Sequence, residues 1–399
     1  MSTTAQELER PQQQSDVGAW LRQNLFNGVL NTLITIVLVI FIPIVLFLIV
    51  RWAIFEATWQ PVATNFRLLM TGRYPIEHVW RIQACMAIIY LLFGLSAGIW
   101  QGMVRTIGIG LVGFAIFFAL FPFSVSARLW LVGSVVAALV GYFVGRPFSS
   151  KLRIPVIVLW LISPFIFWLL IRGGMLGLPL VTTNLWGGLL LTIILAVVGI
   201  IASFPIGVLL ALGRQSKLPI IKWCCTLYIE LVRGVPLISV LFMAVLMLPL
   251  FLPSNIRIDN LVRVLVAITG FSAAYLAENV RGGLQSVPRG QYEAASALGL
   301  NVFQTTFLIV LPQALRAVIP ALVGQFISLF KDTSLVSIVG LAELLGIAGI
   351  VINQPEWLQV TGGVEREVLL FAALVYWFFC YTLSKISRRI EAHLGVGTR

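Results

Sequence analysis

Charged side chains are scarce in this sequence. Of its 399 residues, 11% are charged and 59% are hydrophobic, whereas soluble domains carry roughly 25% charged residues. This composition excludes a soluble globular protein. The apolar residues form repeated runs of about 20 residues, long enough to cross the hydrocarbon core of a bilayer as α-helix, and they lack the alternation expected of a β-barrel. The predicted fold class is therefore an all-α integral membrane protein.

Residues that commonly carry catalysis or bind metals are also few. The chain has two histidines, His78 and His393, separated by most of its length, and four cysteines without a CxxC pair. These spacings predict neither a disulfide framework nor a metal site. The sequence has no GxxxxGK[ST] loop to cradle ATP phosphates, so we expect no ATP site or other cofactor site on this chain. We accordingly expect a protein that is not an enzyme by itself.

The net charge of +12 raises the question of nucleic-acid binding, but the basic residues lie in the gaps between apolar runs and do not form one block. In a membrane protein such charges set the topology by facing the cytoplasm and its anionic lipid. We therefore predict contact with membrane lipid and no nucleic-acid partner.

Apolar length, together with charged and Gly/Pro breaks, predicts about ten spanning helices. The loop at 51–83 is rich in aromatic residues, which suits a structured interfacial segment. The run at 314–348 is too long for one straight span, and its glycines predict a helix followed by an irregular or re-entrant piece. The predicted spans lie near residues 28–50, 84–104, 107–124, 129–145, 154–171, 184–212, 224–252, 262–281, 314–348 and 367–384.

The distribution of Lys and Arg predicts which loops face the cytoplasm. The segments 214–222 and 281–316 and the carboxyl-terminal tail carry more basic than acidic residues, so the positive-inside rule places them in the cytoplasm. The loop at 250–262 and the acidic loop before residue 367 then lie outside. Residues 1–25 are expected to form a mostly disordered cytoplasmic tail. The same alternation places the 51–83 loop outside, although its four arginines oppose that orientation.

One polar stretch, GQYEAASALGLNVFQTTFLIVLPQ at 290–313, interrupts the apolar sequence. Its spacing resembles the EAA loop of ABC-importer permeases. Segments such as YIELVRGVPLISVLF, AAYLAENVRGG and FKDTSLVSIVG resemble the polar amino acid permease family over residues 184–390. The long amino-terminal region and LISVLFMAVLMLPLFLP resemble permease subunits of general L-amino acid ABC importers. The residues that match the loop pattern are Gly290, Glu293, Ala294, Ala295, Gly299, Ile309, Leu311 and Pro312.

The resemblance implies an L-amino acid importer of the bacterial inner membrane that works by alternating access. Residues 184–390 would form a five-helix type I core, with a coupling helix near 290–300 that docks on the ATPase. Residues 26–183 would be an accessory transmembrane region of about five helices, and residues 391–399 a cytoplasmic tail. The implied partners are two ATP-binding subunits, which hold the ATP and Mg²⁺, a second homologous permease and an extracytoplasmic amino-acid-binding protein.

The composition of the loop is compatible with that role. EAASAL contains good helix formers, Gly299 can end the helix in a turn, and the following residues predict a second short helix that Pro312 terminates or bends. A different interpretation also fits the loop chemistry, namely an amphipathic helix that lies on lipid.

Ionisable residues inside the predicted bundle are candidates for a substrate path or gate, because unpaired charge in hydrocarbon is costly. Glu278 and Arg281 are three residues apart and share one helix face. Asp332 is followed by Thr333 and Ser334. Together they offer carboxylates, hydroxyls and a basic group to an amino acid, but bracing between helices explains the same residues. Arg233 is expected to stabilise a helix end or bend before Pro236.

Three other functions compete with the importer interpretation. An ABC permease for another small polar solute would share all of these features. A secondary transporter would carry an internal repeat, and residues 1–183 do not repeat the 184–390 pattern. A membrane enzyme would need a cluster of acid, base or metal-binding residues at one membrane face, and the sequence shows no convincing cluster of this kind.

Overall fold

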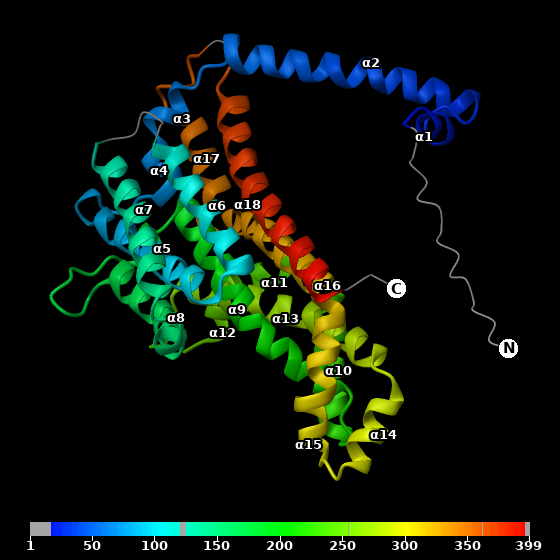
Figure 1. Ribbon diagram of the computed structural model, residues 1–399. Helices are drawn as coiled ribbons and strands as arrows, with labels where there is room; N and C mark the ends of the chain where they lie inside the picture. Colours follow the sequence, from blue (N-terminus) through cyan, green and yellow to red (C-terminus); the bar gives the residue numbers. More distant parts are fainter. Residues whose placement is uncertain (1–16, 120–124, 254, 361, 396–399) are drawn as a thin grey trace. The chain divides into compact units, whose positions relative to one another are not determined.

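The computed structural model describes residues 17–119, 125–253, 255–360 and 362–395, and these residues form helices and connecting loops (Figure 1). Within this part of the chain there is no β-strand, and a single isolated bridge joins Gly188 to Glu343. The internal contacts divide the chain into two units, Met1–Trp59 and Gln60–Arg399. The all-α prediction is therefore confirmed.

The first unit contains two helices, α1 (Val17–Asn24) and α2 (Val29–Arg51), and α2 continues into a π-helical turn at Trp52–Glu56. Helix α1 occupies part of the tail expected to be disordered, while residues 1–16 of that tail lie outside the described residues. Helix α2 is apolar on all sides, and Thr35 is its one buried residue. A helix of this kind is stable where lipid or another apolar surface surrounds it.

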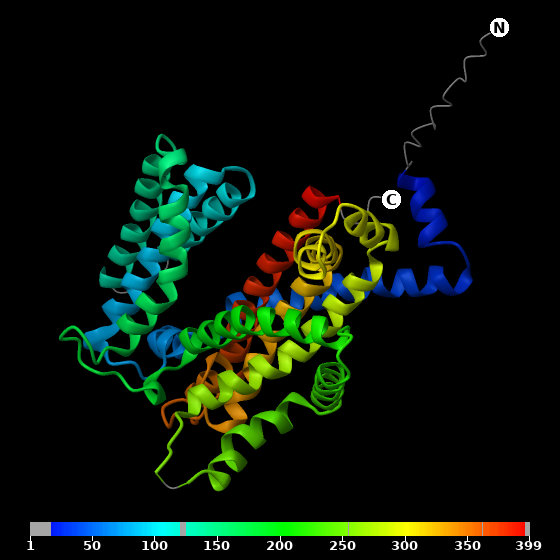
Figure 2. The same ribbon diagram turned by 90° about the horizontal axis from the view of Figure 1, so that it is seen from below.

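The 51–83 loop is structured as predicted, and the second unit begins within it, at Gln60. After two short helices the chain enters a group of four longer helices, and α5 packs against each of the other three (Figure 2). The elements of this region are α3 (Gln60–Thr64), α4 (Phe66–Thr71), a 3-10 turn at Ile76–His78, α5 (Val79–Trp100), α6 (Gly102–Ala119), α7 (Val125–Gly145) and α8 (Ser149–Arg172).

Glycines bring α5 and α7 into close contact. A Cβ atom added at Gly94 would lie 2.1 Å from the Ala138 carbonyl oxygen, and one at Gly141 would lie 2.5 Å from the Leu91 carbonyl oxygen. Such contacts leave no room for a side chain. Small residues spaced four apart permit this approach in membrane helices. Each helix carries such a pair, Gly94 and Gly98 on α5 and Gly141 and Gly145 on α7.

The remaining helices form the core of the second unit. Helices α9 and α13 pack along each other, α13 also packs on α16, and buried Leu195, Ile268 and Leu329 belong to one apolar cluster between them. The elements are α9 (Gly188–Arg214), α10 (Pro219–Arg233), α11 (Leu237–Phe242), a π turn at Met243–Met247, α12 (Leu248–Phe251), α13 (Asn260–Ser286), α14 (Arg289–Ala297), α15 (Val302–Gln304), a π turn at Thr305–Val310, α16 (Leu311–Asp332), a 3-10 segment at Thr333–Val339, α17 (Leu344–Ile352) and α18 (Glu365–Leu394).

Eight helical runs among the described residues are long and apolar enough to span a membrane, or nine if one bent pair counts as a span. Two predicted spans therefore need correction. The run at 224–252 is not straight: α10 and the helical run Leu237–Phe251 meet at 105°, because Pro236 cannot continue the hydrogen-bonding pattern of the helix. The run at 107–124 overlaps α6, whose described apolar part, Gly102–Ile116, is shorter than a full span, and residues 120–124 of this run lie outside the described residues.

The long run at 314–348 is divided as expected. Helix α16 gives way to the 3-10 segment Thr333–Val339, Gly340 adopts a left-handed conformation with φ of 89°, and α17 follows. The second short helix predicted before Pro312 is not separate, however. Helix α15 and the π turn run into α16 as one helical stretch, Val302–Val339. Pro312 follows the π turn Thr305–Val310, and local π adjustments of this kind let a membrane helix continue past a proline.

Candidate coupling and gating sites

The segment predicted to couple to an ATPase, called the coupling segment below, begins with α14, which follows Pro288. Ala295 is buried against the bundle at 3% exposure, while Gly290, Glu293 and Ala294 are exposed. The helix packs through one narrow apolar face, chiefly against the π turn Thr305–Val310, and its charged side is exposed. An exposed helix of this kind is compatible with the predicted coupling helix, whose role stays a prediction.

Gly299 ends α14 in a Schellman turn. Its φ is +75°. The Leu300 N–H donates to the Ala295 carbonyl at 3.1 Å, and the Gly299 N–H donates to the Ser296 carbonyl at 3.0 Å, which is the hydrogen-bond pair of this motif. An L residue in this left-handed conformation costs roughly 1–2 kcal/mol. No atom lies within 4 Å of a Cβ added at Gly299, so space does not limit the side chain here. The left-handed backbone conformation alone favours glycine.

The chain turns at once into the next helix through a capping box. The Asn301 side chain accepts from the Gln304 N–H at 2.9 Å, and the Gln304 side chain accepts from the Asn301 N–H at 3.0 Å. Farther along this helical run, the Gln313 side-chain amide donates to the Gln291 side-chain oxygen at 3.1 Å. Helix α16 is thereby tied to α14. Of the remaining candidates from the loop, Ile309 is half-buried, Leu311 is buried and Pro312 is exposed.

The tip of the coupling segment is apolar and exposed. Leu298, Val302, Phe303 and Leu308 are 80%, 78%, 68% and 65% exposed. We call these four residues the apolar tip. Clustered apolar residues of this size on the surface mark a contact with a partner or with lipid, so both interpretations of the loop predict such a tip.

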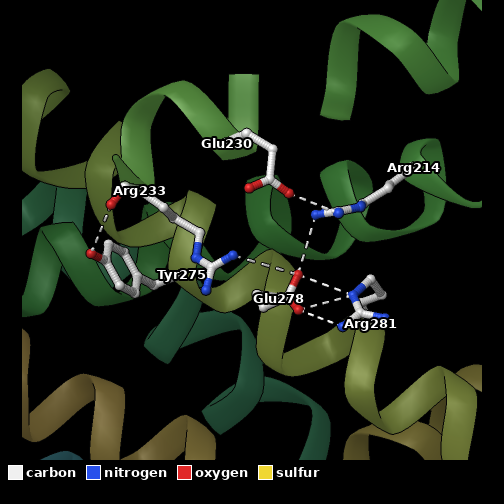
Figure 3. Close-up of polar contacts among 6 residues, drawn as sticks. All are labelled: Arg214, Glu230, Arg233, Tyr275, Glu278 and Arg281. Atoms are coloured by element: carbon white, nitrogen blue, oxygen red, sulfur yellow. Dashed lines mark hydrogen bonds and ion pairs between the residues drawn. The ribbon is translucent and has the colours of Figure 1, made fainter. Parts of the chain in front are cut away.

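Glu278 is the centre of an ion cluster that joins three helices (Figure 3). The Arg281 Nε lies 3.0 Å from each Glu278 carboxylate oxygen. Arg214, at the end of α9, approaches the same carboxylate at 3.3 Å and Glu230 of α10 at 2.8 Å. Arg233 approaches Glu278 at 3.8 Å. The side chains are a quarter to a half exposed, so each individual pair contributes modestly.

Arg233 is the last residue of α10, directly before the bend at Pro236. Its guanidinium lies 5.6 Å from the centre of the Tyr275 ring, and its carbonyl accepts from the Tyr275 hydroxyl at 3.5 Å. These contacts link the end of α10 to α13, in agreement with the expected role of Arg233 at a helix end (Figure 3).

Asp332, Thr333 and Ser334 lie where α16 changes to the 3-10 segment. The buried Thr333 hydroxyl donates to the Phe330 carbonyl at 2.7 Å, and half-buried Asp332 accepts weakly from Ser328 at 3.5 Å. Between described residues, no hydrogen bond or ion pair joins Asp332 to Glu278. The two sets of candidates therefore do not form one polar site in this conformation.

Sequence reasoning missed a buried carboxylate, Glu343. Its side chain is fully buried and accepts from the N–H groups of Leu345 and Gly346 at 2.9 and 2.8 Å. The Tyr376 hydroxyl donates to it at 2.6 Å, and the Thr192 hydroxyl lies at 3.4 Å. Glu343 thus caps α17 and links it to α9 and α18. A lone acidic residue within the apolar run LAELLG was the available signal.

Comparison with known proteins identifies the family. The model of the binding-protein-dependent transport system inner membrane component matches residues 203–395. The inner membrane amino-acid ABC transporter permease protein YhdY of Escherichia coli K12 is 38% identical over 395 residues, which are 95% of this chain and 93% of that protein. The chain belongs to the binding-protein-dependent transport inner membrane component family.

A second relative agrees with this assignment. The glutamate/glutamine/aspartate/asparagine transport system permease protein BztC of Rhodobacter capsulatus is 36% identical, with 96% of each chain covered. A solved structure, an amino acid ABC transporter with histidines, is 30% identical over 52% of this chain and 92% of its own, with a TM-score of 0.45. This member of the family is a multi-pass permease of the inner membrane.

Proposed function

We propose that this chain is the transmembrane subunit of an ABC importer that carries L-amino acids across the bacterial inner membrane. Two relatives that match nearly the whole chain are named for amino-acid transport. The observation that carries the coupling role is the exposed α14 with its Gly299 turn and apolar tip, which forms a rigid projection tied to the membrane bundle.

The proposal assigns three kinds of partner subunit. Two ATP-binding subunits would dock on α14 and hold ATP and Mg²⁺, and a second, homologous permease would complete the translocation path. An extracytoplasmic binding protein would deliver the amino acid, in keeping with the name of the family. Glu293 and the apolar tip would supply the charged and apolar contacts to the ATPase.

A mechanical path from α14 to the bundle supports alternating access. The Gln291–Gln313 hydrogen bond couples α14 to α16. Helix α16 packs on α13, and α13 carries Glu278. Closure of the ATPase dimer would move α14 and α16 together, because the Schellman turn and the capping box hold the segment between them in one shape.

We further propose that the Glu278 cluster holds α9, α10 and α13 together and so controls opening of the translocation path. One carboxylate receives three guanidinium groups from α9, α10 and α13, so separation of these helices must exchange ion pairs. Direct contact of Glu278 or Arg281 with substrate would instead change selectivity among amino acids. Asp332, Thr333 and Ser334 remain candidates for the substrate path, and a change of selectivity on their replacement would likewise indicate substrate contact.

The function is tested by uptake into proteoliposomes that contain the complete transporter. The chain is reconstituted with its partner permease and ATPase, and uptake of radiolabelled acidic, neutral and basic L-amino acids is measured with and without ATP. ATP-dependent uptake of at least one amino acid is expected. Transport restricted to other polar solutes would support the alternative permease, and uptake driven by an ion gradient without ATP would indicate a secondary transporter.

A further inference from the structure

A cavity of about 540 Å³ lies where α9 and α13 begin. These helices end at the other side of the bundle, where Arg214 lies and where α13 leads into α14. Because the basic segments at 214–222 and 281–316 predict a cytoplasmic location for that side, the cavity opens toward the outside. Small-molecule sites typically enclose roughly 300–1,000 Å³, so the cavity is large enough for a free amino acid.

Opposite charges line this cavity without pairing with each other. Arg73 is exposed on one part of the lining, and Asp259, which caps α13, lies on another. No ion pair forms between them in the described structure. The Asp259 carboxylate accepts from the Leu261 N–H at 2.8 Å and the Thr183 hydroxyl at 2.5 Å. Each of its oxygens keeps a further lone pair.

The backbone around Arg73 is held closely against the core. A Cβ atom at Gly72 would lie 2.4 Å from the Gly187 Cα, and the φ of Gly72 is +62°. On the other side of Arg73, the buried Tyr74 hydroxyl donates to the Ile171 carbonyl at 2.7 Å. These contacts fix the base of the Arg73 side chain at the edge of the cavity.

Two buried polar atoms of the lining residues have no hydrogen-bond partner within the described chain: the Trp186 indole N–H and the Asn260 side-chain carbonyl oxygen. Trp186 is only 5% exposed. Unpaired buried polar groups are costly, and here one donor and one acceptor lie beside the same cavity. Both atoms are covered in this conformation, so a ligand would pair with them only when the lining moves.

We propose that this cavity is an outer binding site for free zwitterionic α-amino acids, with Arg73 binding the carboxylate and Asp259 the ammonium group. The inference rests on the proposed amino-acid import and adds a site to it. Arg73 lies outside the family match at 203–395. The amino-terminal region, whose role the resemblance leaves open, would thus supply half of the charge recognition.

The first experiment measures occupancy directly. The complete transporter carrying Asn184→Cys, a substitution of an exposed lining residue, is placed in right-side-out vesicles freed of binding protein and labelled with a membrane-impermeant maleimide. L-Glutamine, L-glutamate and L-arginine are the probes. Butyrate and butylamine, which each lack one of the two charged groups, are the ligand controls. The parent chain gives the labelling background of its own four cysteines.

We expect at least one amino acid to slow labelling several-fold, whereas butyrate and butylamine do not. Adding Arg73→Gln should abolish this protection. Equal protection with and without Arg73, or protection by neither probe nor control, would overturn the site. Protection by butyrate alone would show an anion site and contradict the role of Asp259.

The second experiment measures uptake kinetics. Arg73→Gln and Asp259→Asn should each raise the half-saturating amino acid concentration about tenfold, because each removes a charge-assisted contact. Asparagine is as good a helix cap as aspartate, so α13 should remain intact. Arg257→Gln removes an equal charge from an exposed position in the neighbouring loop, outside the lining residues, and should match the parent chain.

These outcomes separate the site from the proposed function. If the parent transporter imports no amino acid, the proposed function fails. If it imports amino acids but Arg73→Gln and Arg257→Gln behave alike and labelling at position 184 is not protected, only the outer site fails.

Discussion

Replacement of Gly299 tests whether the shape of the coupling segment transmits force. Its φ of +75° is unfavourable for any L residue, and no atom lies within 4 Å of an added Cβ. Alanine there would meet no steric clash, so its whole effect comes from the backbone and amounts to about 1–2 kcal/mol. A strain of this size changes the population of the turn about 5- to 30-fold. Aspartate tolerates the left-handed region better, but it adds a charge to the docking surface.

We expect Gly299→Ala and Gly299→Asp to leave the protein folded in the membrane while uptake per ATP hydrolysed falls or the ATPase docks more weakly. Both quantities are measured in proteoliposomes and by co-purification of the ATPase. Gly113→Ala is the matched control, because Gly113 lies in α6, outside the coupling segment, without a positive φ and with no atom within 4 Å of its added Cβ. Wild-type uptake and co-purification in Gly299→Asp would refute the reasoning.

Three further predictions concern the bundle. Glu278→Gln should lower uptake with little loss of ATPase co-purification, since a neutral amide loses the ion pairs to three guanidinium groups; altered preference among acidic, neutral and basic amino acids would show substrate contact instead. Glu343→Gln should reduce thermal stability, measured by the detergent-solubilised melting temperature, more than Tyr376→Phe, because the carboxylate accepts from two backbone N–H groups as well as from Tyr376. Equal losses would contradict its role as the cap of α17. Gly141→Leu should separate α5 from α7 and lower the melting temperature, because an added Cβ already approaches the Leu91 carbonyl oxygen to 2.5 Å; an unchanged melting temperature would contradict that packing.

Much of the fold is predictable from apolar length and local breakers. The division of the 314–348 run was predicted because Gly340 and the glycines after it interrupt an overlong apolar stretch, and the structure confirms it. The 105° bend in the 224–252 run was not predicted, although Pro236 marks its position. Length alone cannot reveal such a bend, since a broken helix and a straight one have the same apolar composition.

The glycine contact between α5 and α7 shows a second limit. Small residues four apart are common in any membrane bundle, so the pairs on these two helices carry little information until the partner helix is known. The 51–83 loop shows the same limit of prediction from local sequence. Its aromatic content predicted an ordered segment, but only the structure shows Gly72 against Gly187 and Arg73 beside the cavity. Contacts over such sequence distances are absent from local patterns.

In the candidate sites, too, local features were predictable and tertiary contacts were not. The EAA spacing predicted the position of α14 and of the Gly299 turn, because helix formers and a left-handed glycine are local features. Glu278 and Arg281 were paired by helical periodicity, and the structure bears this out at 3.0 Å. The arrival of Arg214 from a different helix depends on tertiary packing, and periodicity within one helix cannot predict it.

The central claim is that ATP hydrolysis on a separate subunit acts through α14, and photo-crosslinking tests it most directly. A photoreactive amino acid replaces Leu298 or Phe303, two residues of the exposed apolar tip, in the transporter assembled in native membranes. The account predicts a covalent adduct with the ATP-binding subunit whose yield changes when ATP is added. Adducts with lipid alone, unaffected by ATP, would show that α14 lies on the membrane surface and would contradict the account.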